Sequence, residues 1–458
     1  MNTSFARYIL IVHYGGPPTF GSVHLLLTRV FDIQNWKNMN LKDLFQIHTF
    51  KLESGLRVAV VPNSRSGVAS INFAFRVGSK DETPRFAGVA HLLEHLMFEG
   101  TRTVAKGDFD RICSTAGGTN NAYTTFDLTS YQMSVPTNQL ELALWLESDR
   151  LYNSEITHEA LENQRKVVLE EILQTVENQP DARWRDRTAA LAFGEDDPYS
   201  WEVHGRREAI SSITLDEINH FRRAFYTPQN SFLVISGDVR PDESLRLAEK
   251  YFSQKLESDI FDRPESTRRI SGMRGEQPDD VPMPAVFLSY HAPSFLSDEI
   301  HAADILTNIL GSGKSSRLNR SLVYEKQAAS YAGAFADKRE LGSLVSVYAF
   351  SNDESADSDS LAAQLQEELD TIISGGIDES EYEKSINQLT TQLAYELQYS
   401  AGLADVCANQ LLFTDSEERV YGLLDRYKRI SREEVRAFGE KFLQEDKAIR
   451  VDVVAEED

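Results

Sequence analysis

The chain of 458 residues is 41% hydrophobic and 26% charged, a balance typical of a folded globular protein with room for two domains. Its 47 basic and 71 acidic residues give a net charge of −24, which argues against a nucleic-acid partner because phosphate recognition needs basic surface. It has two cysteines, Cys113 and Cys407, and their wide separation argues against a disulfide framework and a cysteine-rich metal site.

Residues 1–44 are expected to be an N-terminal extension outside the fold. Their apolar run at residues 8–12 is followed at once by a Gly- and Pro-rich stretch and is too short for a signal peptide. Met39 would serve as a natural start. No apolar run in the chain approaches the roughly 20 residues of a membrane span, so we expect a soluble protein. The cytoplasm is the expected compartment, and the periplasm or an organelle is the alternative.

Residues 45–253 show the patterns of an α+β domain. Strands are predicted where apolar residues alternate, over 50–61, 68–77, 122–135 and 231–236. Helices are predicted where apolar residues recur every three or four positions, over 87–98, 140–151 and 159–176. The strands look like parts of hairpins, so a mainly antiparallel sheet covered by helices is expected.

A linker and a second, related domain are expected in the rest of the chain. Residues 254–281 are rich in charge and contain scattered Pro and Gly, which is typical of an interdomain linker. Residues 282–458 repeat the earlier order of a strand, at 285–290, a polar loop and a helix, at 299–310. The predicted fold class is therefore α+β with two related domains, of which the second lacks metal ligands.

The segment from His91 to His95 carries the strongest chemical signal. Residues four apart on a helix share a face, so His91 and His95 can present two imidazoles to one metal ion. Glu94 lies beside that face and could take a proton from a water molecule that the metal acidifies. The order His-x-x-Glu-His is the inverted form of a common metalloprotease motif. Two packed histidines are the plain alternative, although the otherwise apolar helix gives such a polar trio little reason to lie there.

A third ligand is expected on the helix predicted over 159–176, since a catalytic zinc takes three protein ligands and leaves one position open. That helix contains Glu170 and Glu171. Helical spacing places Glu171 near the edge of the apolar face and Glu170 farther from it, so Glu171 is the better candidate. A solvated helix face is the usual place of a glutamate and is the alternative for either residue.

Three stretches of the sequence carry a specific resemblance to a known family. They are residues 88–101, GVAHLLEHLMFEGT, residues 117–124, GGTNNAYT, and residues 165–171, RKVVLEE. Over roughly residues 45–455 the chain resembles the pitrilysin and mitochondrial-processing-peptidase family of zinc peptidases, in its half-length form with two related domains. The resemblance implies a dimer with one Zn²⁺ per chain. It also implies that His91, His95 and Glu171 hold the metal and that Glu94 is the catalytic base.

The resemblance also implies where peptide substrates bind. Asn121, Ala122 and Tyr123 would form an exposed strand edge that pairs with an extended peptide, unless they belong to an ordinary buried strand. Tyr331 matches the tyrosine of an Arg–Tyr pair that grips the substrate in active relatives, but Tyr324 stands at the arginine position. We therefore expect a dimer, with the choice between homodimer and heterodimer open, and our hypothesis is that a related chain supplies the pair.

A second departure from the family lies two turns before the third ligand. The family often has an acidic residue there, and this chain has Gln164. We expect Gln164 to lie behind the metal ligands, with its orienting role weakened or served by another group.

The sequence therefore predicts a zinc metalloendopeptidase that hydrolyses extended peptides or unfolded segments through a metal-activated water. The alternative from another class is a non-catalytic scaffold subunit of a larger assembly, which metal analysis would distinguish. A third interpretation is an enzyme of related fold that acts on a small molecule, which competition by unstructured peptides would distinguish.

Overall fold

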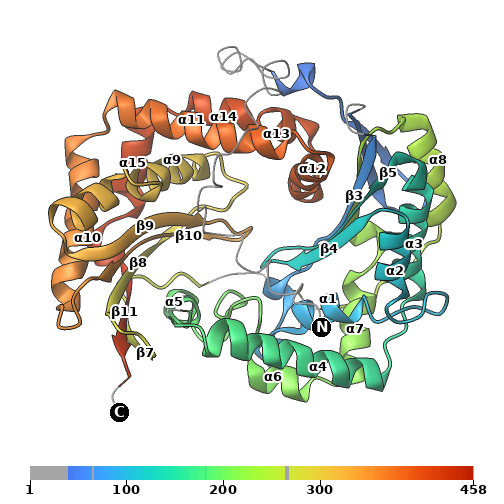
Figure 1. Cartoon of the computed structure of the whole chain (residues 1–458), viewed down its shortest axis with the longest axis horizontal. Helices are drawn as coiled ribbons and strands as arrows, with labels where there is room; N and C mark the ends of the chain where they lie inside the picture. The colour runs from blue at the N-terminus through green and yellow to red at the C-terminus, as the bar shows by residue number, and fades with distance from the viewer. Residues whose placement is uncertain (1–39, 64–66, 181, 262, 264–267, 457–458) are drawn as a thin grey trace. The chain divides into compact units, whose positions relative to one another are not determined.

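Figure 1 shows the computed structural model, which describes residues 40–456 except 64–66, 181, 262 and 264–267. The chain divides into two compact units, residues 1–44 and residues 45–458. In the first unit the described residues form a short 3-10 turn, Leu41–Asp43, capped by the side chain of Asn40. Residues 1–39 lie outside the described residues, so the expectations for the extension and for a start at Met39 stay predictions. Both sheets belong to the second unit.

Six strands form the first sheet, in the order β1-β2-β6-β3-β5-β4. The strands are β1 (His48–Lys51), β2 (Arg57–Pro62), β3 (Val68–Phe75), β4 (Thr119–Thr124), β5 (Thr129–Pro136) and β6 (Ser231–Gly237). Neighbours pair antiparallel except β2 and β6, which are parallel. The sheet is therefore mainly antiparallel, and β4 forms one of its edges.

Two stretches that the sequence predicts as single strands are each a hairpin. Within 50–61 the chain reverses at Gly55, where φ is +92°, and forms β1 and β2. Within 122–135 it reverses after β4, where the Thr125 amide donates to the Leu128 carbonyl at 2.8 Å, and continues as β5. Each tight turn interrupts the apolar alternation over too few residues for the pattern to reveal it.

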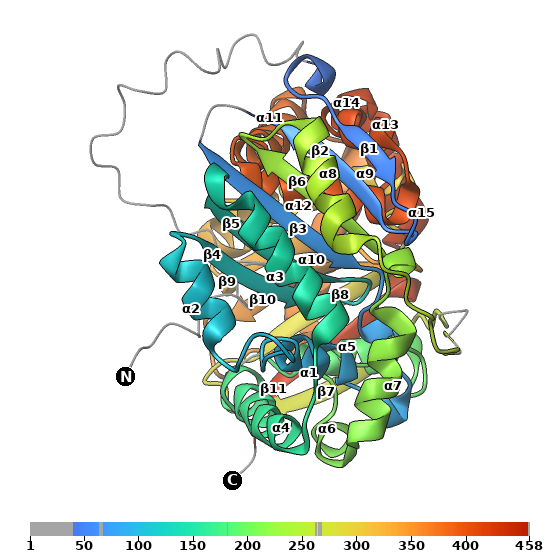
Figure 2. The ribbon, with the colours of Figure 1, turned by 90° about the vertical axis from the view of Figure 1, so that its right-hand side faces the viewer.

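Helices cover both faces of the first sheet. The helices before residue 254 are α1 (Val89–Leu96), α2 (Asp108–Thr115), α3 (Leu140–Asn153), α4 (His158–Ile172), α5 (Trp184–Phe193), α6 (Arg207–Ser212), α7 (Leu215–Phe225) and α8 (Pro241–Phe252). Figure 2 shows α3 and α8 lying across one face, and Figure 1 shows α12 (Ser400–Thr414) against the other. α1 and α4 pack against each other near β4, and α4 continues into a π-helical turn, Leu173–Glu177.

Five strands form the second sheet, in the order β7-β11-β8-β10-β9. The strands are β7 (Arg274–Asp279), β8 (Ala285–Ala292), β9 (Ala329–Asp337), β10 (Ser343–Ser351) and β11 (Ile449–Ala455). The other helices are α9 (Ile300–Gly311), α10 (Ser358–Gly375), α11 (Glu379–Glu396), α13 (Glu417–Tyr421), α14 (Leu423–Arg429) and α15 (Arg432–Phe442). α9, α10 and α15 cover one face, so the α+β fold class with two sheet-and-helix domains is confirmed.

The segment expected to be a linker contributes a strand to the second sheet. β7 lies inside residues 254–281 and pairs in parallel with β11. Its sequence, Arg-Gly-Glu-Gln-Pro-Asp, has no alternation of apolar side chains. The strand is therefore held by backbone pairing at a sheet edge and gives no signal that periodicity can detect. In the described part of the chain, none of the helices has the length and apolarity needed to cross a bilayer.

Each half of the chain contributes one helix that packs on the sheet of the other half. α5 packs on β7, β8 and β11, where the indole of Trp184 stacks on Phe287 with ring centroids 3.9 Å apart. α12 packs on β3 and β6, where the hydroxyls of Ser400 and Ser70 lie 2.8 Å apart. The two sheets are therefore joined by reciprocal packing in addition to the connecting segment.

Candidate metal centre

Helix α1 holds both histidines in a fixed direction. Its apolar residues, Val89, Leu92, Leu93 and Leu96, are almost completely buried in the core of the first half. His91 and His95 follow one another along the helix, with ring centroids 4.8 Å apart and their Nε2 atoms 3.2 Å apart. Because the apolar face fixes the rotation of the helix, both imidazoles point to one spot.

Helix α4 brings a carboxylate to that spot. Val168 and Ile172 anchor α4 in the same core, and Glu171 lies beside them with its side chain 23% exposed. Its Oε2 atom lies 3.5 Å from Nε2 of His95. One ligand atom from each of His91, His95 and Glu171 lies within 4.8 Å of the others. The sequence-based candidates are thus brought together by two separate helices.

The spacing of these atoms can be tested against the geometry of a zinc site. With metal–ligand bonds of 2.0–2.1 Å, two ligand atoms of a tetrahedral zinc lie about 3.3 Å apart. The separations of 3.2 Å between the two Nε2 atoms and 3.5 Å between His95 and Glu171 match that value closely. Two of the three ligand pairs therefore have the spacing of a zinc site, and the three atoms together lie within 4.8 Å of one another. A tetrahedral ion held by them would keep one position for solvent or substrate.

The electrostatics of His91, His95 and Glu171, called the trio from here on, suit a cation. Burial and the neighbouring His95 and His204 hold the pKa of His91 well below its ordinary value. Burial also lowers the pKa of His95, against a hydrogen bond to Gln164 that acts to raise it. Both imidazoles are therefore neutral at physiological pH, which is the form that binds metal. Burial raises the pKa of Glu171, so a nearby cation would relieve the cost of its charge.

Glu94 lies next to the trio and is buried. The hydroxyl of Thr124, the last residue of β4, donates to its Oε2 atom at 2.5 Å. Burial raises the pKa of Glu94 to about 7, against the lowering effect of that hydrogen bond, while Glu171 raises it and Arg150 lowers it. A carboxylate with a pKa near neutrality can both accept and release a proton, as a general base requires.

Gln164 lies behind the metal ligands, on the side of the His95 ring that faces away from His91 and Glu171. It is one of the residues of α4, and its Oε1 atom lies 3.3 Å from Nδ1 of His95. Its Nε2 atom donates to Oε1 of Glu99 at 2.6 Å. The amide therefore contacts a ligand as the sequence position implies, and it also joins that ligand to a carboxylate which the sequence did not single out.

The residues expected to bind peptide lie in two places. Asn121, Ala122 and Tyr123 belong to β4, at the edge of the first sheet. The hydroxyl of Tyr123 donates to Asp405 of α12 at 2.7 Å, so the tyrosine ring is held toward that helix. Tyr331 lies on β9, at an edge of the second sheet, with its ring 5.8 Å from that of Tyr348.

Sequence reasoning missed a residue that holds the N-terminus of α1. Glu82 is fully buried and accepts hydrogen bonds from the backbone amides of Gly88 and Ala90, each at 2.8 Å. The indole of Trp201 donates to the same carboxylate at 2.9 Å. The first amides of a helix have no partners inside the helix, and Glu82 satisfies two of them. Burial raises the pKa of Glu82 to about 8, against the lowering effect of these hydrogen bonds. An isolated glutamate nine residues before the motif gives no periodic signal.

Replacing Glu82 with alanine is expected to destabilise the fold by about 3 kcal/mol, because three buried donors lose their acceptor. Glu82→Gln keeps the shape and part of the accepting capacity, so its loss should be smaller. The free energy of unfolding in urea checks both values. An alanine variant as stable as the wild type would contradict the assigned role.

A third histidine lies close to the trio. His204 places its Nε2 atom 3.3 Å from Oδ2 of Asp186 on α5. Its carbonyl abuts Gly88, where φ is +97° and a Cβ atom would lie 2.9 Å from that oxygen. Burial acts to lower the pKa of His204, but Asp186, Glu202 and Glu171 raise it overall. An imidazole paired with a carboxylate thus borders the metal ligands, and no motif in the sequence indicated it.

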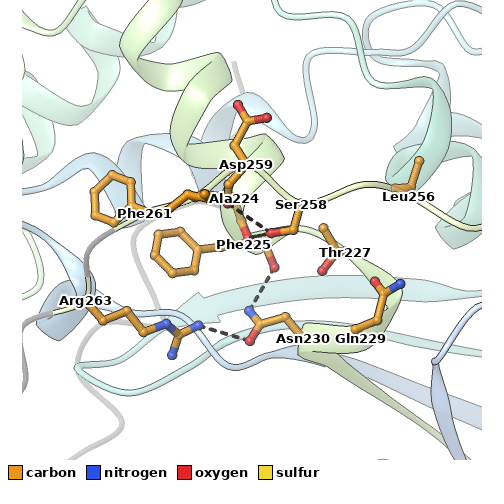
Figure 3. Close-up of a pocket in the computed structure, with 11 residues that line it drawn as sticks. Ala224, Phe225, Thr227, Gln229, Asn230, Leu256, Ser258, Asp259, Phe261 and Arg263 are labelled. Atoms are coloured by element: carbon orange, nitrogen blue, oxygen red, sulfur yellow. Dashed lines mark hydrogen bonds between the residues drawn. The ribbon is translucent and has the colours of Figure 1, made fainter.

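A cavity elsewhere in the first half does not include the metal ligands. It has a volume of about 460 Å³ and is lined by the end of α7, by residues 227, 229 and 230 that follow it, and by residues 256, 258–261 and 263. Figure 3 shows that some of its polar groups are paired with one another: Arg263 donates to Asn230, and Ser258 donates to the carbonyl of Ala224.

An inverted His-x-x-Glu-His helix, a glutamate from a second helix and two helix-covered sheets define a two-domain metallopeptidase-like protein. The chain belongs to peptidase family M16. The family model described as insulinase (peptidase family M16) matches residues 57–197, and that described as the peptidase M16 inactive domain matches residues 212–389. The resemblance seen in the sequence, including the half-length two-domain type, is confirmed.

Individual relatives agree with this assignment. The zinc protease PqqE of Helicobacter pylori is 30% identical over 382 residues, which are 82% of this chain and 84% of the relative. A probable mitochondrial-processing peptidase subunit beta of Arabidopsis thaliana is 25% identical over 421 residues, 88% of this chain and 77% of the relative. The crystal structure of a protease from Helicobacter pylori matches with a TM-score of 0.85 at 25% identity, covering 90% of this chain and 99% of that one.

Proposed function

We propose that this chain is a zinc-dependent endopeptidase in which His91, His95 and Glu171 hold one zinc ion. The observation that carries the proposal is the convergence of three ligand atoms within 4.8 Å of one another, with both separations from His95 close to the spacing of a tetrahedral zinc site. The relatives named zinc proteases support the choice of metal. A zinc ion bound there would polarise the scissile carbonyl and acidify a water molecule.

Glu94 is the proposed general base. Its carboxylate accepts the proton that the attacking water loses and can return that proton to the leaving amine. The hydrogen bond from Thr124 fixes Oε2, so the other oxygen is the one available for the proton. The raised pKa of Glu94, about 7, suits a group that must bind the proton and then release it.

The proposed substrate is an extended peptide or an unfolded segment that adds to the edge of β4. Thr124 at the end of this strand contacts Glu94, so a peptide paired along Asn121, Ala122 and Tyr123 would run toward the metal ligands. Pairing through backbone hydrogen bonds satisfies the peptide's amides without reading many of its side chains. The enzyme would therefore accept varied sequences.

The proposed active form is a dimer with a related chain. Tyr331 would contact the peptide in the second half, but the matching arginine position holds Tyr324, which is 53% exposed. Arg317 cannot replace it, because its guanidinium forms an ion pair with Glu381 at 2.7 Å and donates to the carbonyl of Gly376. A partner that carries an Arg–Tyr pair would complete the substrate site.

The purified chain is expected to contain one zinc per chain and to cleave unfolded peptides when a related partner is present. Elemental analysis gives the zinc content, and mass spectrometry of a mixed peptide pool gives the cleavage. A chelator should abolish cleavage, and added zinc should restore it, because the three ligands are neutral or anionic and rebind the metal.

The outcomes separate the proposed functions. Stoichiometric zinc with chelator-sensitive cleavage supports the peptidase. A chain without zinc, or one that holds zinc and leaves all peptides intact both alone and with its partner, would favour a non-catalytic scaffold. Strong cleavage by the chain alone would contradict the need for a partner but not the peptidase.

A further inference from the structure

We propose that Glu99 is a positioning residue for the metal centre, which acts through Gln164 to hold His95 in its metal-binding tautomer. This inference rests on the proposed zinc site and extends it by one residue. It assigns a role to a side chain that neither the motif nor the family resemblance marks, and it explains how this chain works without an acidic residue at position 164.

The metal-facing nitrogen of His95 determines where its proton must lie. Its Nε2 atom faces the trio, 3.2 Å from His91 and 3.5 Å from Glu171. A neutral imidazole that binds a metal through Nε2 must carry its single proton on Nδ1. That proton needs an acceptor, and the atom opposite Nδ1 is Oε1 of Gln164, at 3.3 Å.

The direction of the Gln164 amide depends on its second neighbour. An amide can turn over and exchange its oxygen for its nitrogen, so its orientation is set by what surrounds it. The other end of this amide meets Oε1 of Glu99 at 2.6 Å, and a carboxylate oxygen only accepts. If the amide turned over, its oxygen would face the Glu99 carboxylate and its NH₂ group would face the Nδ1 proton of His95. Both contacts would be repulsive, so Glu99 fixes the amide with its oxygen toward His95.

Glu99 is itself held rigidly. It lies three residues after the end of α1, its amide donates to the Leu96 carbonyl at 3.1 Å, and its side chain is only 7% exposed. Its other carboxylate oxygen lies 2.5 Å from Nζ of Lys106, whose side chain is 59% exposed. The carboxylate is therefore held in place from both sides. The Glu99 carboxylate therefore acts on His95 through the Gln164 amide, in place of the direct carboxylate–histidine contact common at metal sites.

A charge reversal tests this chain of contacts. In Glu99→Lys the ammonium donates, which favours the turned amide and the wrong His95 tautomer. We expect the zinc dissociation constant to rise by about 10–100-fold, as for loss of other groups behind metal ligands. Adding Gln164→Glu should restore affinity to near the wild-type value, because that carboxylate accepts from both His95 and the new lysine. Competition with a fluorescent chelator measures each constant.

Matched controls keep the test specific. Glu170→Gln makes a similar change at an exposed carboxylate of α4 that bonds to Gln174, outside the proposed contacts, and should leave zinc affinity unchanged. Glu99→Gln, which can still present an oxygen to Gln164, should show a smaller loss and serves if Glu99→Lys does not fold. Thermal unfolding of the metal-free proteins reports general damage.

The failure of each hypothesis is distinguishable. A wild-type chain that binds no zinc would overturn the proposed function itself. A wild type that binds zinc beside Glu99 variants of equal affinity would overturn the role of Glu99 alone. That role would also be overturned if the double variant bound zinc no better than Glu99→Lys, since only a relay through position 164 predicts rescue.

Discussion

Glu94→Gln is expected to leave zinc bound and to lower kcat for peptide hydrolysis by about 10²–10⁴-fold, the usual contribution of a positioned general base. The amide has nearly the size of the carboxylate and can still accept the hydrogen bond from Thr124, so α1 and its histidines stay in place. The variant differs in that it cannot take up a proton. Zinc analysis together with single-turnover cleavage separates loss of chemistry from loss of metal.

If Glu94→Gln kept the wild-type rate, Glu94 would not be the general base. The His204–Asp186 pair would then be the next group to consider as a base, since it borders the trio and its Nε2–Oδ2 distance is 3.3 Å. A variant that lost zinc as well as rate would instead indicate that Glu94 helps to hold the metal, and Glu94→Asp would show whether charge alone is needed.

Glu171→Gln is expected to weaken zinc binding by more than the roughly 10–100-fold that follows loss of a group behind the ligands. The amide oxygen is a poorer ligand, and the site loses its anionic charge. The metal-free variant should be at least as stable as the wild type. The raised pKa of Glu171 means that the fold disfavours its charged form, so a neutral side chain removes a cost at pH 7.

The neighbouring glutamate offers a matched control. Glu170 is exposed on the same helix and bonds to Gln174 at 2.7 Å, so Glu170→Gln makes the same chemical change one residue away from the ligands. Chelator competition should show wild-type zinc affinity for this control. Equal affinities for both variants would mean that Glu171 does not bind the metal, and the peptidase proposal would lose its third ligand.

Local periodicity in the sequence was enough to predict the candidate metal ligands. The four-residue spacing of His91 and His95 depends only on helix geometry, and the apolar face of the later helix was enough to prefer Glu171 over Glu170. These are properties of single elements, which neighbouring residues determine. The α+β class and the two related domains followed from the order of such elements.

The supporting contacts could not be predicted because they join distant parts of the chain. Tyr123 bonds to Asp405, 282 positions away, and Glu82 bonds to Trp201, 119 positions away. Neither carboxylate belongs to a repeating pattern, so only the tertiary fold reveals its partner. The contact of Gln164 with Glu99 spans 65 positions and depends on how α1 and α4 cross, which the sequence pattern does not specify.

The reciprocal placement of α5 and α12 bears on how such a chain could have arisen. Suppose that each half descends from a single-sheet ancestor. A helix that covers the other copy's sheet is then what a domain-swapped homodimer would contain, with the two copies later joined end to end. Fusion would turn an association that depends on protein concentration into a permanent one. It would also free one half to lose its metal ligands, because its sheet and helices would still be needed to complete the core of the half that kept them.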